Sequence, residues 1–191
     1  METEEAIAKV NGIEVCYSVN GPIDGDPLLL IMGLGAQLIA WPIEFVEILA
    51  DEGFRVIRFD NRDSGLSTKT IGKPPEALDL LAKALNGEEV ESFYSLSDMA
   101  NDAVALLNFL GYESAHIVGV SMGGMIAQTL AIEHPNCARS LTSIGSVTGA
   151  PELFTPTEEA LEAIIGDTPE TREEIIRANV IGSRALAGPL W

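Results

Sequence analysis

Apolar and less apolar residues alternate along the segment from Ile13 to Val19. This two-residue period is typical of a half-buried strand. The pair Asn11-Gly12, which is favoured in two-residue hairpin turns, separates this segment from another apolar segment over residues 6–10. The chain is therefore predicted to open with an antiparallel hairpin.

Four later segments have the apolar character of strands, and these are residues 28–31, 54–59, 115–119 and 140–144. Between them lie segments with helical patterns, which are residues 41–52, 95–110 and 122–134. Ser95 to Asp98 has the pattern of a capping box, and glycine follows the first two helices. Strands and helices that alternate in this way need right-handed crossovers. A mainly parallel sheet with helices on both faces is predicted, with ligands bound beyond the carboxyl ends of its strands.

The pattern changes beyond Gly149. Helices are predicted over residues 155–166 and from residue 168 to about 181, and no further strand is predicted. Residues 71–94 are expected to form an insertion with one short helix near residues 76–85. Residues 1–150 are therefore expected to be a core with six strands, and residues 151–191 a separate helical segment.

The composition indicates a folded globular protein, because 47% of the 191 residues are hydrophobic. The formal charge of −18 repels phosphate backbones and anionic lipid surfaces, so no nucleic acid partner is expected. The N-terminus lacks the features of a signal peptide, and no apolar run approaches the ~18 to 20 residues of a membrane span. A cytoplasmic protein without a membrane partner is predicted.

The two cysteines, Cys16 and Cys137, are expected to be idle thiols, because a disulfide is not favoured without a secretory signal. Neither cysteine belongs to a cluster of His, Cys or Asp at the spacing of metal ligands. We therefore expect no metal and no cofactor.

The segment Gly119 to Gly124 (GVSMGG) joins the predicted strand 115–119 to the predicted helix 122–134. Between a strand and a helix, the pattern G-x-S-x-G is typical of a nucleophile elbow, here with Ser121 as the nucleophile. Glycine on both sides of the serine allows a tight turn that β-carbons would block. The alternative is a glycine-rich turn that serves packing alone.

Three segments in the same order and spacing together resemble the α/β-hydrolase superfamily: residues 30–35 (LIMGLG), 59–67 (FDNRDSGLS) and 119–124 (GVSMGG). The resemblance covers residues 6–150. Within the superfamily, the chain is similar in particular to small cytoplasmic esterases of the aclacinomycin methylesterase type. It implies an α/β-hydrolase fold that is incomplete at its C-terminal side. Residues 151–191 would then be the beginning of the helical lid.

The resemblance implies that Ser121 is the nucleophile and that the backbone N–H groups of Leu34 and Met122 form the oxyanion hole. Backbone donors suit this role because they are in place before charge develops on the substrate oxygen. The side chains of Leu34 and Met122 would then only line a pocket.

The chain departs from the family pattern at two positions. Met32 stands where many relatives carry histidine, and Asp63 stands where a glycine is common. Both are interpreted as subfamily traits. Asp60, Arg62 and Asp63 are expected to brace the loop and not to act as catalysts.

A serine nucleophile needs a general base within hydrogen-bond reach. His116 lies five residues before Ser121 on a strand, which at ~3.3 Å per residue places it some 10 to 15 Å from the site. His134 lies thirteen residues along the following helix, which at ~1.5 Å per residue is about 20 Å away. Neither is expected to be the base. A lysine base, Lys69 or Lys73, is the less favoured alternative.

In the family, the acid and the histidine come after strands that follow the lid, and these would need about 60 residues more at ~30 per unit of strand and helix. The chain is therefore expected to be inactive or nearly so alone, either as a fragment or as a naturally shortened relative. The fragment is favoured, because residues 140–144 would otherwise form an unpaired sheet edge. Self-association through such an exposed edge is a further expectation.

The function predicted from these residues is the hydrolysis of a small apolar ester through a Ser121 acyl-enzyme. A serine nucleophile favours acyl chemistry over the opening of epoxides or haloalkanes, for which relatives use aspartate. One alternative is a non-catalytic ligand-binding or assembly protein that retains a hydrolase-like cradle. Another is a cofactor-free perhydrolase or an acyltransferase, which would use the same elbow.

Overall fold

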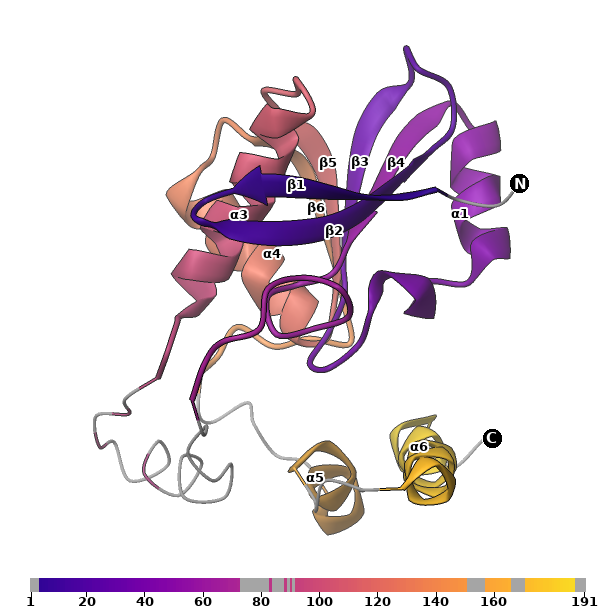
Figure 1. Cartoon of the computed structure of the whole chain (residues 1–191), viewed down its shortest axis with the longest axis vertical. Helices are drawn as coiled ribbons and strands as arrows, with labels where there is room; N and C mark the ends of the chain where they lie inside the picture. Colours follow the sequence, from indigo (N-terminus) through magenta and orange to yellow (C-terminus); the bar gives the residue numbers. More distant parts are fainter. Residues whose placement is uncertain are drawn as a thin grey trace. The chain divides into compact units, whose positions relative to one another are not determined.

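The computed structural model describes residues 4–72, 83, 88, 90, 92–150, 157–165 and 171–187 of the chain (Figure 1). Internal contacts divide the chain into two compact units, one of residues 1–73 and 92–149, and the other of residues 74–91 and 150–191. The first unit contains the sheet, and the second contains the helices α5 and α6.

The first unit is built on a six-stranded sheet with the strand order β1-β2-β4-β3-β5-β6. The strands are β1 (Glu5–Val10), β2 (Ile13–Asn20), β3 (Asp26–Ile31), β4 (Phe54–Phe59), β5 (Ala115–Val120) and β6 (Ala138–Ile144). β2 pairs antiparallel with both β1 and β4, whereas all pairs among β4, β3, β5 and β6 are parallel. The predicted hairpin and the predicted mainly parallel sheet are confirmed.

Helices cover both faces of this sheet, as predicted: α1 (Ile43–Asp51) lies on one face, and α3 (Leu96–Phe109) and α4 (Met122–Glu133) lie on the other (Figure 1). The central strand β3 shows why. Leu29 and Ile31 belong to the hydrophobic core that includes α3 and α4, whereas Leu28 and Leu30 belong to the core that includes α1. Successive residues of a strand point to opposite faces, so a continuous apolar run marks a strand that is buried on both.

Helix α3 begins at the predicted capping box. The Ser95 hydroxyl accepts the Asp98 backbone N–H at 3.2 Å, and the Asp98 carboxylate accepts the Ser95 backbone N–H at 2.8 Å. The chain then leaves the helix through Gly111, whose φ of 85° lies in the left-handed region that favours glycine. Local sequence signals therefore account for both ends of this helix.

The second unit contains α5 (Glu158–Ile165) and α6 (Arg172–Ala187), which pack against each other. Helix α6 begins later and ends later than the predicted range of 168 to 181. The reason at the start is a second capping box, in which Thr171 and Glu174 exchange hydrogen bonds at 2.9 and 3.3 Å. The short helix predicted near residues 76–85 lies almost entirely outside the described residues.

Strand β6 is the edge strand of the described sheet, and it is exposed from Arg139 to Ile144. The exposed edge expected from the sequence is thus present in the described residues, while self-association through it stays a prediction. Among the helices that the structure describes, none is long and apolar enough to cross a membrane.

The Ser95–Asp98 capping box predicts a pH-dependent contribution to stability. Hydrogen bonds from the Ser95 backbone N–H and hydroxyl lower the pKa of Asp98. A carboxyl whose pKa is lower in the folded state stabilises the fold above its unfolded pKa and loses that contribution as the pH falls through the folded pKa. Ser95→Ala should cost about 1 kcal/mol of unfolding free energy at neutral pH.

Urea denaturation followed by circular dichroism between pH 7 and pH 2 measures this contribution. The stability difference between the wild-type chain and Asp98→Ala should be constant near neutral pH and shrink at acid pH. In the Ser95→Ala background, Asp98→Ala should have a smaller and flatter effect, because the donors that lower the pKa are partly removed. A difference that does not change with pH in the wild-type background would refute the assignment.

Candidate active site

Ser121 lies on a strained bend between the end of β5 and the first turn of α4, and it is exposed. Its φ of 54° and ψ of −125° are unusual for a residue with a β-carbon, and such geometry costs about 1–3 kcal/mol. The backbone is held on both sides: the Ser121 N–H donates to the Ile144 carbonyl at 2.9 Å, and the Ser121 carbonyl accepts the Gly124 N–H at 2.9 Å. The serine hydroxyl is thereby presented at the carboxyl edge of the parallel strands.

The glycines around Ser121 are required because backbones approach each other closely there. A β-carbon at Gly119 would lie 2.1 Å from the Gly123 carbonyl oxygen, and a β-carbon at Gly123 would lie 2.2 Å from the carbonyl oxygen of Ile31. Helix α4 thus begins in direct backbone contact with both β5 and β3. This contact is the physical reason for the G-x-S-x-G pattern.

The loop that follows β3 lies beside the serine. A β-carbon at Gly33 would be 3.0 Å from the β-carbon of Ser121, and the next residue, Leu34, is 61% exposed. Met122, the first residue of α4, flanks the serine on its other side along the chain. Both segments that were predicted to supply oxyanion donors therefore adjoin Ser121, and the donor role of the two amides stays a prediction.

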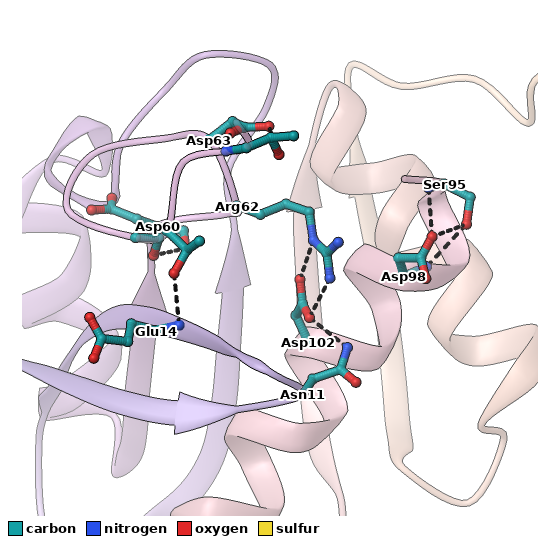
Figure 2. A network of polar contacts seen from close by, with 11 residues as sticks. Asn11, Glu14, Asp60, Arg62, Asp63, Ser95, Asp98 and Asp102 are labelled. Atoms are coloured by element: carbon teal, nitrogen blue, oxygen red, sulfur yellow. Dashed lines mark hydrogen bonds and ion pairs between the residues drawn. The ribbon is translucent and has the colours of Figure 1, made fainter. Parts of the chain in front are cut away.

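The loop that follows β4 reaches the same edge of the sheet and is braced by charges. Arg62 forms a bidentate pair with Asp102 of α3, with nitrogen–oxygen distances of 2.7 and 2.8 Å (Figure 2). Asn11 donates to the same carboxylate at 2.7 Å, and the Arg62 guanidinium lies 5.0 Å from the centre of the Tyr94 ring. The hydrogen bonds to Asp102 raise the pKa of Arg62, so this arginine is a permanent structural charge.

Asp63 occupies a position with a φ of 66°, which explains why a glycine is common there in the family. Its carboxylate accepts hydrogen bonds from the backbone N–H and the hydroxyl of Thr70. Burial by itself would raise the pKa of Asp63, but the bonds from Thr70 and Tyr94 lower it. Burial and the bond to Asp63 raise the pKa of Tyr94 to about 12. Asp63 therefore connects Thr70 and Tyr94 through hydrogen bonds, and these contacts stabilise the loop.

Asn61 and Asp102 are buried polar residues at this edge that the sequence analysis did not single out. Asn61 is 2% exposed and donates to the Met32 carbonyl at 2.9 Å, and Asp102 is also 2% exposed. The capping and hydrophobic patterns of α3 gave no sign that Asp102 pairs with a residue forty positions earlier. A signal for Asn61 was available, because it directly follows Asp60 in the second family motif.

Both histidines have partners away from the serine. His116 Nδ1 lies 2.7 Å from the Ser140 hydroxyl, and its ring packs edge-on against Phe54. His134 Nε2 lies 2.8 Å from Asn101 Oδ1. In the residues that the structure describes, no hydrogen bond joins either imidazole to Ser121.

Two further candidates for a base or a nucleophile among the described residues, Lys69 and Cys16, are also engaged or inactive. Lys69 Nζ donates to the carbonyls of Gly65 and Ser67 at 2.8 and 3.1 Å, and Lys73 lies outside the described residues. Cys16 is a free, buried thiol, and burial, with the charge of Asp60 as the next cause, raises its pKa to about 11. A thiol with that pKa is a poor nucleophile at neutral pH. Within the described ranges, no group of three or more His, Cys, Asp or Glu side chains is placed to hold a metal ion.

A mainly parallel sheet between two helical layers, with an exposed serine on a strained strand-to-helix bend, is the arrangement that defines α/β hydrolases. The chain belongs to the alpha/beta hydrolase fold family, whose model matches residues 26–185. The predicted fold class and superfamily are therefore confirmed.

The comparisons also support the predicted likeness to methylesterases. Rhodomycin D methylesterase DauP of Streptomyces sp. strain C5 is 38% identical over 124 residues, which are 65% of this chain and 36% of that protein. Rhodomycin D methylesterase DnrP of Streptomyces peucetius is 38% identical over 116 residues, 61% of this chain and 33% of the relative. The chain thus spans about a third of the length of these two relatives.

A solved structure agrees with the fold. The structure of 2-hydroxy-6-oxo-6-phenylhexa-2,4-dienoate hydrolase from Rhodococcus matches with a TM-score of 0.66 at 22% identity. The match covers 84% of this chain and 52% of that protein. At this identity the likeness shows the fold alone.

The packing of the elbow predicts a large difference between two glycine substitutions. Gly123→Ala should lower the unfolding free energy by about 3 kcal/mol, because its methyl group would overlap a backbone carbonyl that side-chain motion cannot move. Gly111→Ala is the matched control, since it has nothing within 4 Å of the added carbon and meets only the strain of a positive φ, at about 1 kcal/mol. Urea midpoints measured by circular dichroism test this, and equal losses would contradict the proposed contact.

Proposed function

We propose that this chain carries the nucleophile of a carboxylic-ester hydrolase, with Ser121 forming the acyl-enzyme. The observation that carries the proposal is the conformation of Ser121, an exposed serine with a φ of 54° at the carboxyl edge of the sheet. Strain at a single residue that the surrounding structure maintains is typical of a functional site. A turn that served packing alone could carry glycine at this position without strain.

In the proposed reaction, the Ser121 hydroxyl gives up its proton to solvent water while its Oγ attacks the ester carbonyl carbon, and the carbonyl oxygen becomes an oxyanion. The N–H groups of Leu34 and Met122 donate to that oxyanion. The carbon–oxygen bond to the alcohol then breaks, the alcohol leaves with a proton, and water later releases the acid from the acyl-serine. The close approach of Gly33 to Ser121 supports this assignment, since it brings the loop with Leu34 to the reacting oxygen.

A carboxylic ester is the proposed substrate class because two relatives are named methylesterases. The surroundings of the serine favour a small apolar ester. Met32 and Leu34 flank Gly33, which approaches the serine, and Met122 follows the serine in the chain; Met32 is buried while Leu34 is largely exposed. An apolar lining with a few polar donors is the usual character of a small-molecule site.

The reaction needs a general base, and the described residues of this chain place no histidine against Ser121. Both histidines of the sequence are bonded to Ser140 and Asn101, away from the serine. We therefore propose that the 191-residue chain is weakly active by itself. The same observation supports a second candidate function, a non-catalytic binding protein that retains the hydrolase cradle.

Ser121→Ala distinguishes the two functions. The unsubstituted chain should hydrolyse p-nitrophenyl butyrate weakly. The oxyanion donors by themselves should accelerate the reaction about 10³- to 10⁴-fold over its rate in water. Mass spectrometry of the tryptic peptides should find a butyryl group on Ser121, and the variant should lack it. Equal rates in the two proteins without any adduct would support the binding protein. A large rate that depends on Ser121 would instead mean that a base reaches the serine in solution.

The oxyanion role of Leu34 resides in its amide and can be tested at that atom. Leu34→Pro removes the N–H donor and should lower the rate of Ser121 butyrylation by about 10²- to 10³-fold. Leu34→Ala keeps the donor and should lose far less. Urea denaturation of both variants checks that the fold is retained, and similar rates for the two variants would exclude Leu34 as an oxyanion donor.

A further inference from the structure

We infer that Asp60 and Asn61 are positioning residues, which hold the loop of residues 32–38 at both of its ends and so fix the Leu34 amide beside Ser121. This inference rests on the proposed function and deepens it. The pair directly follows β4, whose carboxyl end lies at the same edge of the sheet as that of β3. Residues 32–38 are called the oxyanion loop below.

Asp60 holds the C-terminal end of the oxyanion loop. Its Oδ1 accepts the Leu38 N–H at 2.7 Å, and its Oδ2 accepts the Leu66 N–H at 2.8 Å. Leu38 is the first residue of a short 3-10 helix (Leu38–Ala40), and Gln37 before it makes no side-chain capping bond. Asp60 thus supplies from another loop the acceptor that a local cap would provide, and charge-assisted bonds of this kind are among the stronger ones.

Asn61 holds the N-terminal end of the same loop. Its side-chain amide donates to the Met32 carbonyl at 2.9 Å, and the residue is 2% exposed. Met32 directly precedes Gly33, the residue that approaches Ser121. Two consecutive side chains therefore reach the two ends of one loop, and the proposed oxyanion donor lies between these ends.

The middle of the oxyanion loop is held less tightly than its ends. It has a turn bond from the Ala36 N–H to the Gly33 carbonyl at 3.3 Å, while Leu34 and Gly35 are exposed. Gly35 has a φ of 69°, and a β-carbon there would meet nothing within 4 Å. Since packing does not enclose this part of the loop, its position depends on the anchors at its ends.

Asp60 is itself rigid, which an anchor must be. It is 3% exposed, its N–H donates to the Cys16 carbonyl at 2.9 Å, and its carbonyl accepts the Ser67 hydroxyl at 2.7 Å. Gly65 allows the loop to close over the carboxylate, because a β-carbon there would lie 1.9 Å from Asp60 Oδ2. Support of this kind around a site keeps the reacting groups within the narrow geometry that they need.

Two readouts test the inference on the 191-residue chain. The first is hydrogen exchange of the Leu38 amide, measured by NMR, which does not depend on any reaction. The second is the rate of Ser121 butyrylation by p-nitrophenyl butyrate over a range of concentrations, which separates the maximal rate from the half-saturating concentration. The variants are Asp60→Ala, Asp60→Asn and Asn61→Ala, and Asp63→Asn is the matched control from the same loop, because it braces Thr70 and not the oxyanion loop.

Asp60→Ala should accelerate exchange at Leu38 and lower the maximal rate of butyrylation about 10- to 100-fold, with little change in the half-saturating concentration. Asn61→Ala should lower the maximal rate in the same way. Asp60→Asn keeps one acceptor for Leu38 and should restore part of both losses. Asp63→Asn should leave exchange at Leu38 and the maximal rate as in the unsubstituted chain.

Unchanged hydrogen exchange at the Leu38 amide in a folded Asp60→Ala protein would overturn the inference that Asp60 anchors the oxyanion loop. Equal losses of rate in the Asp60 variants and Asp63→Asn would also overturn it, because they would show a general effect of loop stability. If the unsubstituted chain shows no Ser121-dependent butyrylation, the proposed function fails together with the catalytic part of the inference. The exchange at Leu38 then decides by itself whether Asp60 anchors the loop.

Discussion

The site depends on one close contact, the backbone packing of α4 against β5 and β3. The carbonyl oxygens of Gly123 and Ile31 lie where β-carbons at positions 119 and 123 would have to be. Because no side chain separates these backbones, the first turn of α4 begins directly at the sheet edge, and Ser121 must adopt a positive φ to make the connection. Core packing and the position of the serine therefore have the same cause.

The parallel order of β4, β3, β5 and β6 brings the segments after these strands to one edge of the sheet. Each contributes a different physical element there. The segment after β5 presents the serine, and the loop after β3 lies beside it. The loop after β4 contains Asp60 and Asn61, whose buried side chains form hydrogen bonds to the loop after β3. The end of β6 supports the bend through the hydrogen bond from Ser121 to Ile144. The brace formed by Arg62 and Asp102 connects this edge to α3.

Much of the fold could be predicted from the sequence, because its signals are local. The hairpin turn, the strands predicted at 54–59 and 115–119 and the capping box at Ser95 each depend on residues a few positions apart. The start of α6 was predicted four residues too early, since Thr168-Pro169 and the Thr171–Glu174 capping box are competing local signals. The elbow could be predicted because glycine and serine in that context have few other physical explanations.

The sequence by itself determined the order of strands and helices, the presence of a serine on a tight bend and the distance of both histidines along the chain from it. Only the tertiary structure decided which distant residues meet. Asp60 reaches Leu38, Asn61 reaches Met32, and the two histidines bond to Ser140 and Asn101. Such pairs depend on strand order and on the packing of helices against the sheet, and a local pattern of residues carries no record of either.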